Sequence, residues 1–170
     1  MKIYIASDHA GYDMKNTLQR FLVGEGHEVV DCGPYEFNEA DDYPDYVAEV
    51  ANHVSKEPET NWGIVIGGSG EGEAIMANRF ANVRAVVYNG ESNSLDGRKM
   101  TDKITLTREH NNSNVLALGS WFLTEQQAKD SVLRWLSTEF KPEERHLRRL
   151  QKIEKLAPHG VSDSSSNASL

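Results

Sequence analysis

Short apolar runs alternate along the chain with segments of helical period. The runs at 2–6, 27–31, 62–66, 84–88 and 115–118 each have the length of a strand. The run at 62–66 (WGIVI) is almost continuously hydrophobic, which is typical of a strand buried on both faces of a parallel sheet. The pattern therefore predicts five strands.

The segments between the strands carry helix signals. Met14, Leu18, Phe21 and Leu22 fall on one helical face. Thr124, with Gln127 three residues on, is a capping-box signature, and proline suits a first helical turn. The expected helices are 11–22, one from Pro44 through Val54, one containing Ile75 and Met76 after the glycine-rich segment, 125–136, and one from Pro142 to about Leu156.

Alternating strands and helices predict an α/β domain with a mostly parallel sheet and right-handed crossovers. Ligands of such sheets bind beyond the carboxyl ends of the strands. The segments SDHAG (7–11) and GGSGEGE (67–73) follow two of the strands, so both are expected at that functional edge.

Three polar segments interrupt this pattern. Residues 33–42 are rich in turn formers and are predicted as a loop. Residues 89–105 have no clear period and are predicted as an inserted loop, and 157–170 as a disordered tail. We therefore expect a single domain over residues 1–156.

The composition of the chain argues against some classes of binding partner. The 170 residues carry a net charge of −8, which argues against non-specific binding to nucleic acids or anionic membranes. One cysteine excludes an intrachain disulfide, and no stretch approaches the roughly 18 apolar residues of a membrane span. A cytoplasmic protein is expected.

Candidate chemistry is concentrated in the glycine-rich segment 67–73. Four glycines in six residues exceed what a simple turn needs, and they let backbone N–H groups converge on an anion, either a phosphate or a developing enediolate. The order of the glycines is not that of a dinucleotide fingerprint, and the lysine of a Walker loop is absent. Glu71 and Glu73 make the segment acidic, which favours proton transfer over phosphate binding.

Three other groups of residues have a structural and a functional interpretation. Asp8 is either a helix cap or, with His9, part of the same crevice as the glycine segment. His110 precedes a strand and is either structural or functional. Arg145 and Arg149 are four residues apart, so they share a helical face and either grip one phosphate or belong to a solvated face with a Glu144–Arg148 pair.

Taken together, the motifs resemble the family of ribose-5-phosphate isomerase B, which includes galactose-6-phosphate isomerase subunits. The resemblance covers about residues 1–156 and rests on six segments: SDHAG (7–11), DYP (42–44), GGSGEGEAIMANR (67–79), RAVV (84–87), EHNN (109–112) and RHLRR (145–149). It implies a Rossmann-like three-layer α/β/α sandwich with a five-stranded sheet. It also implies a homodimer or tetramer with shared active sites, no metal and no organic cofactor.

The resemblance further implies an aldose–ketose isomerisation of a sugar phosphate through a cis-enediolate. Many members have a catalytic cysteine where this chain has Gly67, so the chain is similar to the subgroup whose base is a glutamate, here Glu73. The resemblance implies that Ser69 and the N–H groups of Gly70 and Gly72 stabilise the enediolate, and that Asp8 and His110 serve ring opening and the hydroxyl protons. It implies that Tyr43 and Asn111 hold the sugar and that His9, Arg145 and Arg149 bind the phosphate. Gly68 and His146 are further substrate-binding residues, with His146 near the phosphate.

Two departures concern the substrate. Trp121 stands where family members often have an arginine, and the polar stretch 89–105 is longer than usual. They leave one alternative to ribose 5-phosphate isomerisation, the isomerisation of another sugar phosphate such as a tetrose or hexose phosphate. The absence of the loop cysteine at Gly67 leaves a second alternative, a non-catalytic sugar-phosphate-binding module.

Overall fold

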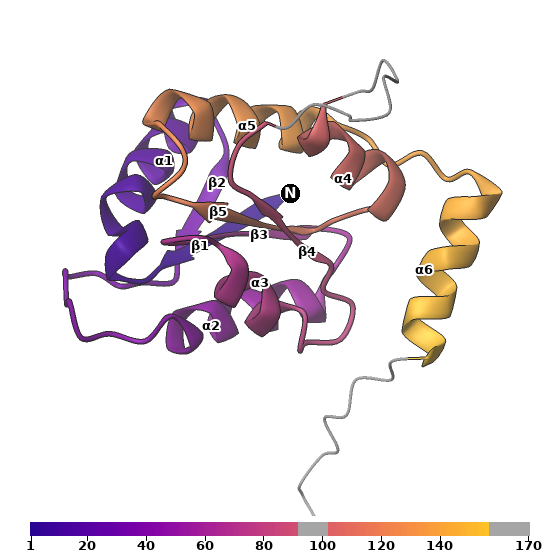
Figure 1. Ribbon diagram of the computed structural model, residues 1–170, viewed down its shortest axis with the longest axis horizontal. Coiled ribbons are helices and arrows are strands. Elements are labelled where there is room, and N and C mark those ends of the chain that lie inside the picture. Colours follow the sequence, from indigo (N-terminus) through magenta and orange to yellow (C-terminus); the bar gives the residue numbers. More distant parts are fainter. Residues whose placement is uncertain (92–101, 157–170) are drawn as a thin grey trace, which may run out of the picture.

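Five parallel strands form one sheet in the computed structural model, which describes residues 1–91 and 102–156 (Figure 1). The sheet order is β2-β1-β3-β5-β4, and every neighbouring pair is parallel. The five predicted strands and the mostly parallel sheet are therefore confirmed. The strands are β1 (Lys2–Ser7), β2 (Glu28–Asp31), β3 (Asn61–Gly67), β4 (Ala85–Tyr88) and β5 (Val115–Gly119).

Helices cover both faces of the sheet, which gives the expected three layers (Figure 1). The helices are α1 (Tyr12–Gly24), α4 (Lys103–Asn111) and α5 (Glu125–Ser137) on one face, α2 (Tyr43–Lys56) and α3 (Glu71–Ala77) on the other, and α6 (Glu144–Leu156), which stands apart beside α4. A short 3-10 turn, η1 (His9–Gly11), leads from β1 into α1.

The two-residue period of the strands divides the core between these faces. Ile3 and Ile5 of β1 pack on the α1–α5 side, while Tyr4 and Ala6 pack on the α2–α3 side. Because β1, β3 and β5 lie between two helical layers, their apolar side chains are buried on both faces. This explains why these strands read as nearly continuous hydrophobic runs.

Helix α4 corrects one prediction. Residues 89–105 were expected to be a loop, but α4 begins at Lys103, and Asp102 caps it by accepting a hydrogen bond from the Thr105 N–H at 2.9 Å. Ile104 is fully buried in the core, so tertiary packing gives a helix to a segment whose polar composition indicated none. Residues 92–101 and the expected tail 157–170 lie outside the described residues.

Strand order also locates the point where a ligand is expected. From β1 the chain crosses to β2 on one side and then to β3 on the other, so β1 and β3 form the topological switch point of the sheet. The segments after these two strands are those that sequence patterns placed at the functional edge. None of the helices in the described part of the chain is long and apolar enough to cross a membrane.

Candidate active site

Asp8 lies between the ends of β1 and β3. Its backbone N–H donates to the Ile66 carbonyl at 3.3 Å, and its side chain accepts a hydrogen bond from the Gly11 N–H at 3.2 Å. The predicted capping role is thus confirmed for η1. A Cβ on Gly11 would lie only 2.4 Å from the Ile66 carbonyl oxygen, so glycine lets this turn dock directly against the end of β3.

The glycine loop, residues 67–73, is held in place by the turn after β5. The Ser120 N–H donates to the Gly67 carbonyl at 2.8 Å, and the Ser120 hydroxyl lies 2.9 Å from that oxygen and 2.8 Å from the Ala10 carbonyl. Gly70 has a φ of 81° as the residue before α3, a conformation that favours glycine. The loop therefore enters α3 in a fixed geometry.

Glu73 lies in the first turn of α3 and is 4% exposed. Its carboxylate occupies the space that a side chain at position 67 would need. A Cβ on Gly67 would lie 1.8 Å from Glu73 Oε1 and 2.3 Å from Cδ. The absence of a side chain at Gly67 is thus what admits the carboxylate to the end of β3.

The environment of Glu73 tunes its acidity. Burial is the largest effect and raises the pKa of the carboxyl group above its ordinary value, and the nearby Asp8 charge raises it further. The Glu73 backbone N–H, a donor in the first turn of the helix, lowers the pKa but does not cancel the effect of burial. Both effects on the pKa of Glu73, burial and the N-terminus of a helix, are expected from the sequence, and burial is the larger.

Two aromatic side chains pack against the glycine loop. A Cβ on Gly72 would come within 2.7 Å of Tyr43 Cζ, and one on Gly68 within 2.6 Å of Trp121 Cζ2. Tyr43 is half-buried at the start of α2, whereas Trp121 is 74% exposed. The loop therefore lies between a tyrosine and a largely open indole.

His9 faces the loop that precedes α2. Its ring nitrogen Nδ1 lies 2.8 Å from Asp41 Oδ1, and its backbone N–H donates to the same oxygen at 3.0 Å. The hydrogen bond to Asp41 is the main cause that raises the pKa of His9 above its ordinary value. The predicted site residues at this edge, which we call the loop cluster, are Asp8, His9, Tyr43, Gly68, Ser69, Gly70, Gly72 and Glu73.

The remaining predicted residues form a second group, the helix cluster, where α4 meets α6. The His110 and His146 rings lie 4.4 Å apart between centroids, and burial followed by the charges of His146 and Arg145 lowers the pKa of His110. Arg145 and Arg149 are exposed on α6, and Arg145 donates to Glu143 at 2.8 Å. The helix cluster consists of His110, Asn111, Arg145, His146 and Arg149.

The two clusters lie at opposite ends of the strands. The turn after α4 contacts the start of β3, because the Gly63 N–H donates to the Asn114 carbonyl at 2.9 Å. The glycine loop follows the carboxyl end of β3. The five residues of the neighbouring strand β5 span about 16 Å, which is the distance between the two ends of the strands. One chain therefore brings together the residues within each cluster but not the two clusters.

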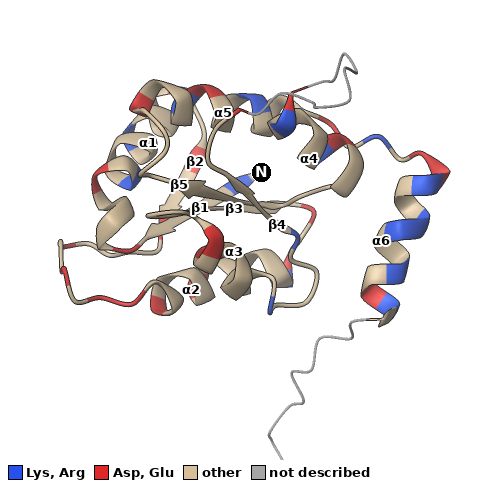
Figure 2. Ribbon diagram, viewed as in Figure 1, with Lys and Arg blue, Asp and Glu red and all other residues tan. Residues whose placement is uncertain are grey.

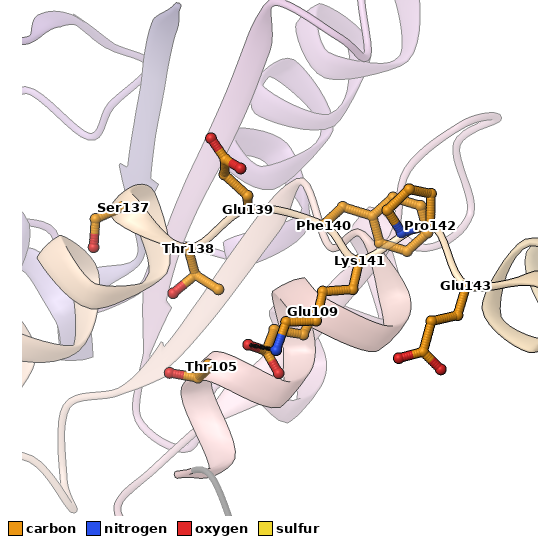
Figure 3. A pocket seen from close by; sticks show the side chains of 9 residues that line it. All are labelled: Thr105, Glu109, Ser137, Thr138, Glu139, Phe140, Lys141, Pro142 and Glu143. Carbon is orange, nitrogen blue, oxygen red and sulfur yellow. Dashed lines mark ion pairs between the residues drawn. The ribbon is translucent and has the colours of Figure 1, made fainter.

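Figure 3 shows a pocket beside the helix cluster, at the junction of α4, α5 and α6. The side chains of Glu109 and Lys141 point toward each other across it and form an ion pair of 2.6 Å. Its other charged lining residues, Glu139 and Glu143, are acidic, so this pocket does not suit a phosphate. It marks the bend at which the chain leaves α5 for α6.

Sequence patterns did not point to Asp41 or Ser120 as neighbours of the predicted site residues. Asp41 lies in the segment 33–42 that was predicted as a loop, and its place beside His9 depends on two segments 32 residues apart. Ser120 follows a strand that ends at the same edge as the glycine loop, which was an available signal. Among the described residues, no group of three or more His, Cys, Asp or Glu side chains is arranged to hold a metal ion.

The chain is similar to known proteins over most of its length. The model of a family described as "Ribose/Galactose Isomerase" matches residues 3–153. The ribose-5-phosphate isomerase B of Escherichia coli is 37% identical over 89% of this chain and 93% of its own length. That of Mycolicibacterium paratuberculosis is 33% identical over 88% and 87%.

Solved structures extend this similarity to the fold. Ribose-5-phosphate isomerase B of Mycoplasma genitalium, with bound ribulose-5-phosphate, matches with a TM-score of 0.81 and 35% identity, over 91% of this chain and 95% of that one. The Clostridium thermocellum ribose-5-phosphate isomerase B matches with a TM-score of 0.79 and 40% identity, over 92% and 97%. The similarity thus covers both clusters and the sheet between them.

Proposed function

This chain belongs to the ribose/galactose isomerase family, and on that premise we propose that it interconverts ribose 5-phosphate and ribulose 5-phosphate through a cis-enediolate, with Glu73 as the base. The observation that carries the proposal is the Glu73 carboxylate, which is buried at the end of β3 in the space left by Gly67. A similar protein with bound ribulose-5-phosphate supports the choice of substrate.

The reaction requires one group that moves a proton between adjacent carbons. In the open-chain sugar, Glu73 takes the proton from C2 of the aldose, and the electron pair forms the C1–C2 double bond as the C1 oxygen becomes an enediolate oxygen. Glu73 then gives a proton to C1, either the one it took or one exchanged with solvent, while the proton of the C2 hydroxyl passes to the C1 oxygen, which gives the ketose. A carboxyl group with a raised pKa suits both steps, because it accepts and releases the proton with a smaller difference in free energy.

The enediolate needs hydrogen-bond donors at the place where its charge develops. The backbone N–H groups of Gly70 and Gly72 and the Ser69 hydroxyl supply them in this proposal, from a loop that Ser120 holds in position. Asp8 lies close enough to Glu73 for its charge to raise the pKa of that group. Asp8 and His110 then serve ring opening and the hydroxyl protons.

Phosphate binding requires the helix cluster, which one chain keeps a strand length away from the loop cluster. We therefore include a second subunit in the proposal: each site combines one subunit's loop cluster with the other subunit's helix cluster, in a dimer or tetramer. Tyr43 and Asn111 would hold the sugar. His9, Arg145, His146 and Arg149 would bind its phosphate.

The charges of the two clusters support this arrangement. Basic residues predominate along α6, which stands off the body of the domain (Figure 2). The loop cluster is acidic through Asp8 and Glu73, and Asp41 adds a third carboxylate beside it. The positive charges that lower the pKa of His110 would be offset by a bound phosphate dianion. A cytoplasmic location belongs to the same proposal, because the one cysteine, Cys32, is a buried free thiol, as expected in a reducing compartment.

Trp121 supports a second candidate within the same reaction class. Its indole, packed against Gly68, offers an aromatic face to a ligand in place of an arginine charge. A substrate of another length, a tetrose or hexose phosphate, would place different atoms against that face. A non-catalytic binding module is the third candidate, and it predicts binding of sugar phosphates without turnover.

A panel of aldose phosphates tests these candidates. We expect the highest kcat/KM for ribose 5-phosphate, with ribulose 5-phosphate as the product. A higher value for a tetrose or hexose phosphate would transfer the assignment to that sugar. Binding of the whole panel without turnover of any member would support the binding module.

Mixed dimers test the shared site. A Glu73→Gln subunit and an Arg145→Ala/Arg149→Ala subunit are each expected to be nearly inactive alone. After subunit exchange at equal amounts, half of the dimers are mixed and each holds one intact site, so activity should return to about one quarter of wild type. No recovery, with exchange verified by mass, would contradict sites that span two subunits.

A further inference from the structure

We propose that Asp41 is a positioning residue for His9: it fixes both the backbone and the imidazole of His9, so that Nε2 presents an N–H group to the substrate phosphate. The inference rests on the proposed function, which assigns His9 to the phosphate. Asp41 itself touches no reacting atom in this account, and it acts only through His9.

The geometry carries the proposal. A single oxygen, Asp41 Oδ1, accepts the His9 backbone N–H at 3.0 Å and lies 2.8 Å from His9 Nδ1. The Asp41 side chain is 3% exposed and that of His9 is 36% exposed. Two contacts to one buried acceptor restrict both the position and the rotation of the ring, and Nε2 is the ring nitrogen left for a ligand.

The loop that carries Asp41 is itself anchored. The ammonium group of Lys15, which is fully buried, donates to the Pro34 carbonyl and to both Asp31 oxygens at 2.8 Å. Near Asp41 the Asn38 carbonyl accepts the Asp41 N–H at 3.2 Å. The loop is therefore anchored at its start, and at its end the Asp41 side chain is buried, which suits a group that orients another side chain.

The chemistry explains why a carboxylate is needed at this point. In neutral imidazole, a proton held on Nδ1 by Asp41 would leave Nε2 as an acceptor, which repels a phosphate oxygen. In the imidazolium form both nitrogens donate. Asp41 favours that form, because a hydrogen bond to a carboxylate raises the pKa of the ring.

The other titratable groups around the pair act in the same direction or are neutral. Asp8, at the end of β1, and Glu39, in the same loop as Asp41, are acidic, and their charges also raise the pKa of His9. Tyr46 of α2 faces Asp41, and burial followed by that charge raises the pKa of the phenol, which keeps it neutral. Among these acidic side chains, the His9 imidazolium is therefore the positively charged group that a phosphate can bind.

Asp41→Asn separates charge from shape. The amide can still accept the backbone N–H, so the loop is expected to keep its place, while the imidazolium loses its counter-charge. We expect KM for ribose 5-phosphate to rise by about tenfold at pH 7.5, the loss of one charge-assisted contact, with kcat within about twofold. The rise in KM should begin at a lower pH in the variant than in wild type, because His9 loses its proton earlier.

Glu39→Gln is the matched control. It removes an acidic charge from the same loop but no hydrogen bond to His9, so KM is expected to stay within about twofold of wild type. An equal rise in KM for both variants would assign the effect to loop charge in general and overturn a specific role of Asp41.

A measurement without substrate keeps the test independent of the proposed function. Nitrogen NMR of histidine-labelled, unliganded wild-type protein should show His9 protonated on Nδ1 and titrating above the ordinary histidine value of 6.5. Inorganic phosphate should bind Asp41→Asn about tenfold more weakly than wild type at pH 7.5. Wild-type protein that turns over no ribose 5-phosphate but shows both results would refute the proposed function and support the role of Asp41.

The opposite results overturn the inference. A wild-type His9 that titrates at or below its ordinary value, or that carries its proton on Nε2, would contradict it even if Asp41→Asn failed to fold. A folded Asp41→Asn protein with an unchanged His9 titration and an unchanged pH profile of KM would show that Asp41 only fastens the loop.

Discussion

Gly67→Ala is a sharp perturbation of the proposed site, because it adds one methyl group beside the base. The new Cβ would lie 1.8 Å from Glu73 Oε1, so the carboxylate has to move by about 1.6 Å to reach an ordinary contact of 3.4 Å. A displacement of about 1 Å at a reacting group costs about 100-fold in rate. We therefore expect kcat to fall by about 100-fold or more, with KM within about threefold because the phosphate contacts are elsewhere.

Steady-state kinetics of purified Gly67→Ala with ribose 5-phosphate gives both constants. Gly24→Ala is the matched control, because a Cβ there meets nothing within 4 Å and its kcat should equal that of wild type. Overpacking by one methyl group costs about 1–3 kcal/mol of stability, so thermal unfolding verifies that the variant is folded at the assay temperature. A folded Gly67→Ala enzyme with wild-type kcat would refute the proposed coupling between Gly67 and the Glu73 carboxylate.

Three further predictions concern acidity and stability. Because burial raises the pKa of Glu73, the acid limb of kcat/KM should lie above the ordinary glutamate value of 4.5, with activity lost as pH falls through the raised pKa; a limb at or below 4.5 would contradict this. Lys15→Met leaves the Asp31 carboxylate without its buried partner and should lower the free energy of unfolding by about 3 kcal/mol, measured by urea denaturation. A loss below about 1 kcal/mol would contradict a stabilising role of the Lys15–Asp31 ion pair. Asp102→Ala removes the cap of α4 and should cost about 1 kcal/mol in the same assay, whereas an unchanged midpoint and slope would argue against the cap.

Sequence patterns predicted the elements whose signals are local. The capping box of Thr124 and Gln127 is present, and the strands follow their hydrophobic runs because the central ones are buried on both faces. Helix α4 was not predicted, because only a few of its positions are buried and the segment before it is polar. Its formation depends on the packing of Ile104 against strands that are distant in sequence.

The site was predictable to the same extent. Parallel topology alone predicts that the segments of Asp8 and Glu73 lie together at the carboxyl ends of the strands. The distance between the two clusters was not predictable, because it depends on where α4 ends and α6 begins relative to the sheet. The contact of Asp41 with His9 was not predictable either, because it joins two loops whose relative position only the fold determines.

Glu73→Gln, followed by proton exchange as well as turnover, tests the central claim most directly. In deuterated water the wild-type enzyme should incorporate solvent deuterium at the reacting carbon of the sugar phosphate, whereas Glu73→Gln should bind inorganic phosphate normally but show neither exchange nor appreciable turnover. The folded Gln variant should also be at least as stable as wild type at neutral pH: the carboxyl pKa is raised on folding, so the ionised group disfavours the fold above that pKa. Exchange and turnover at wild-type rates in Glu73→Gln would show that another group is the base.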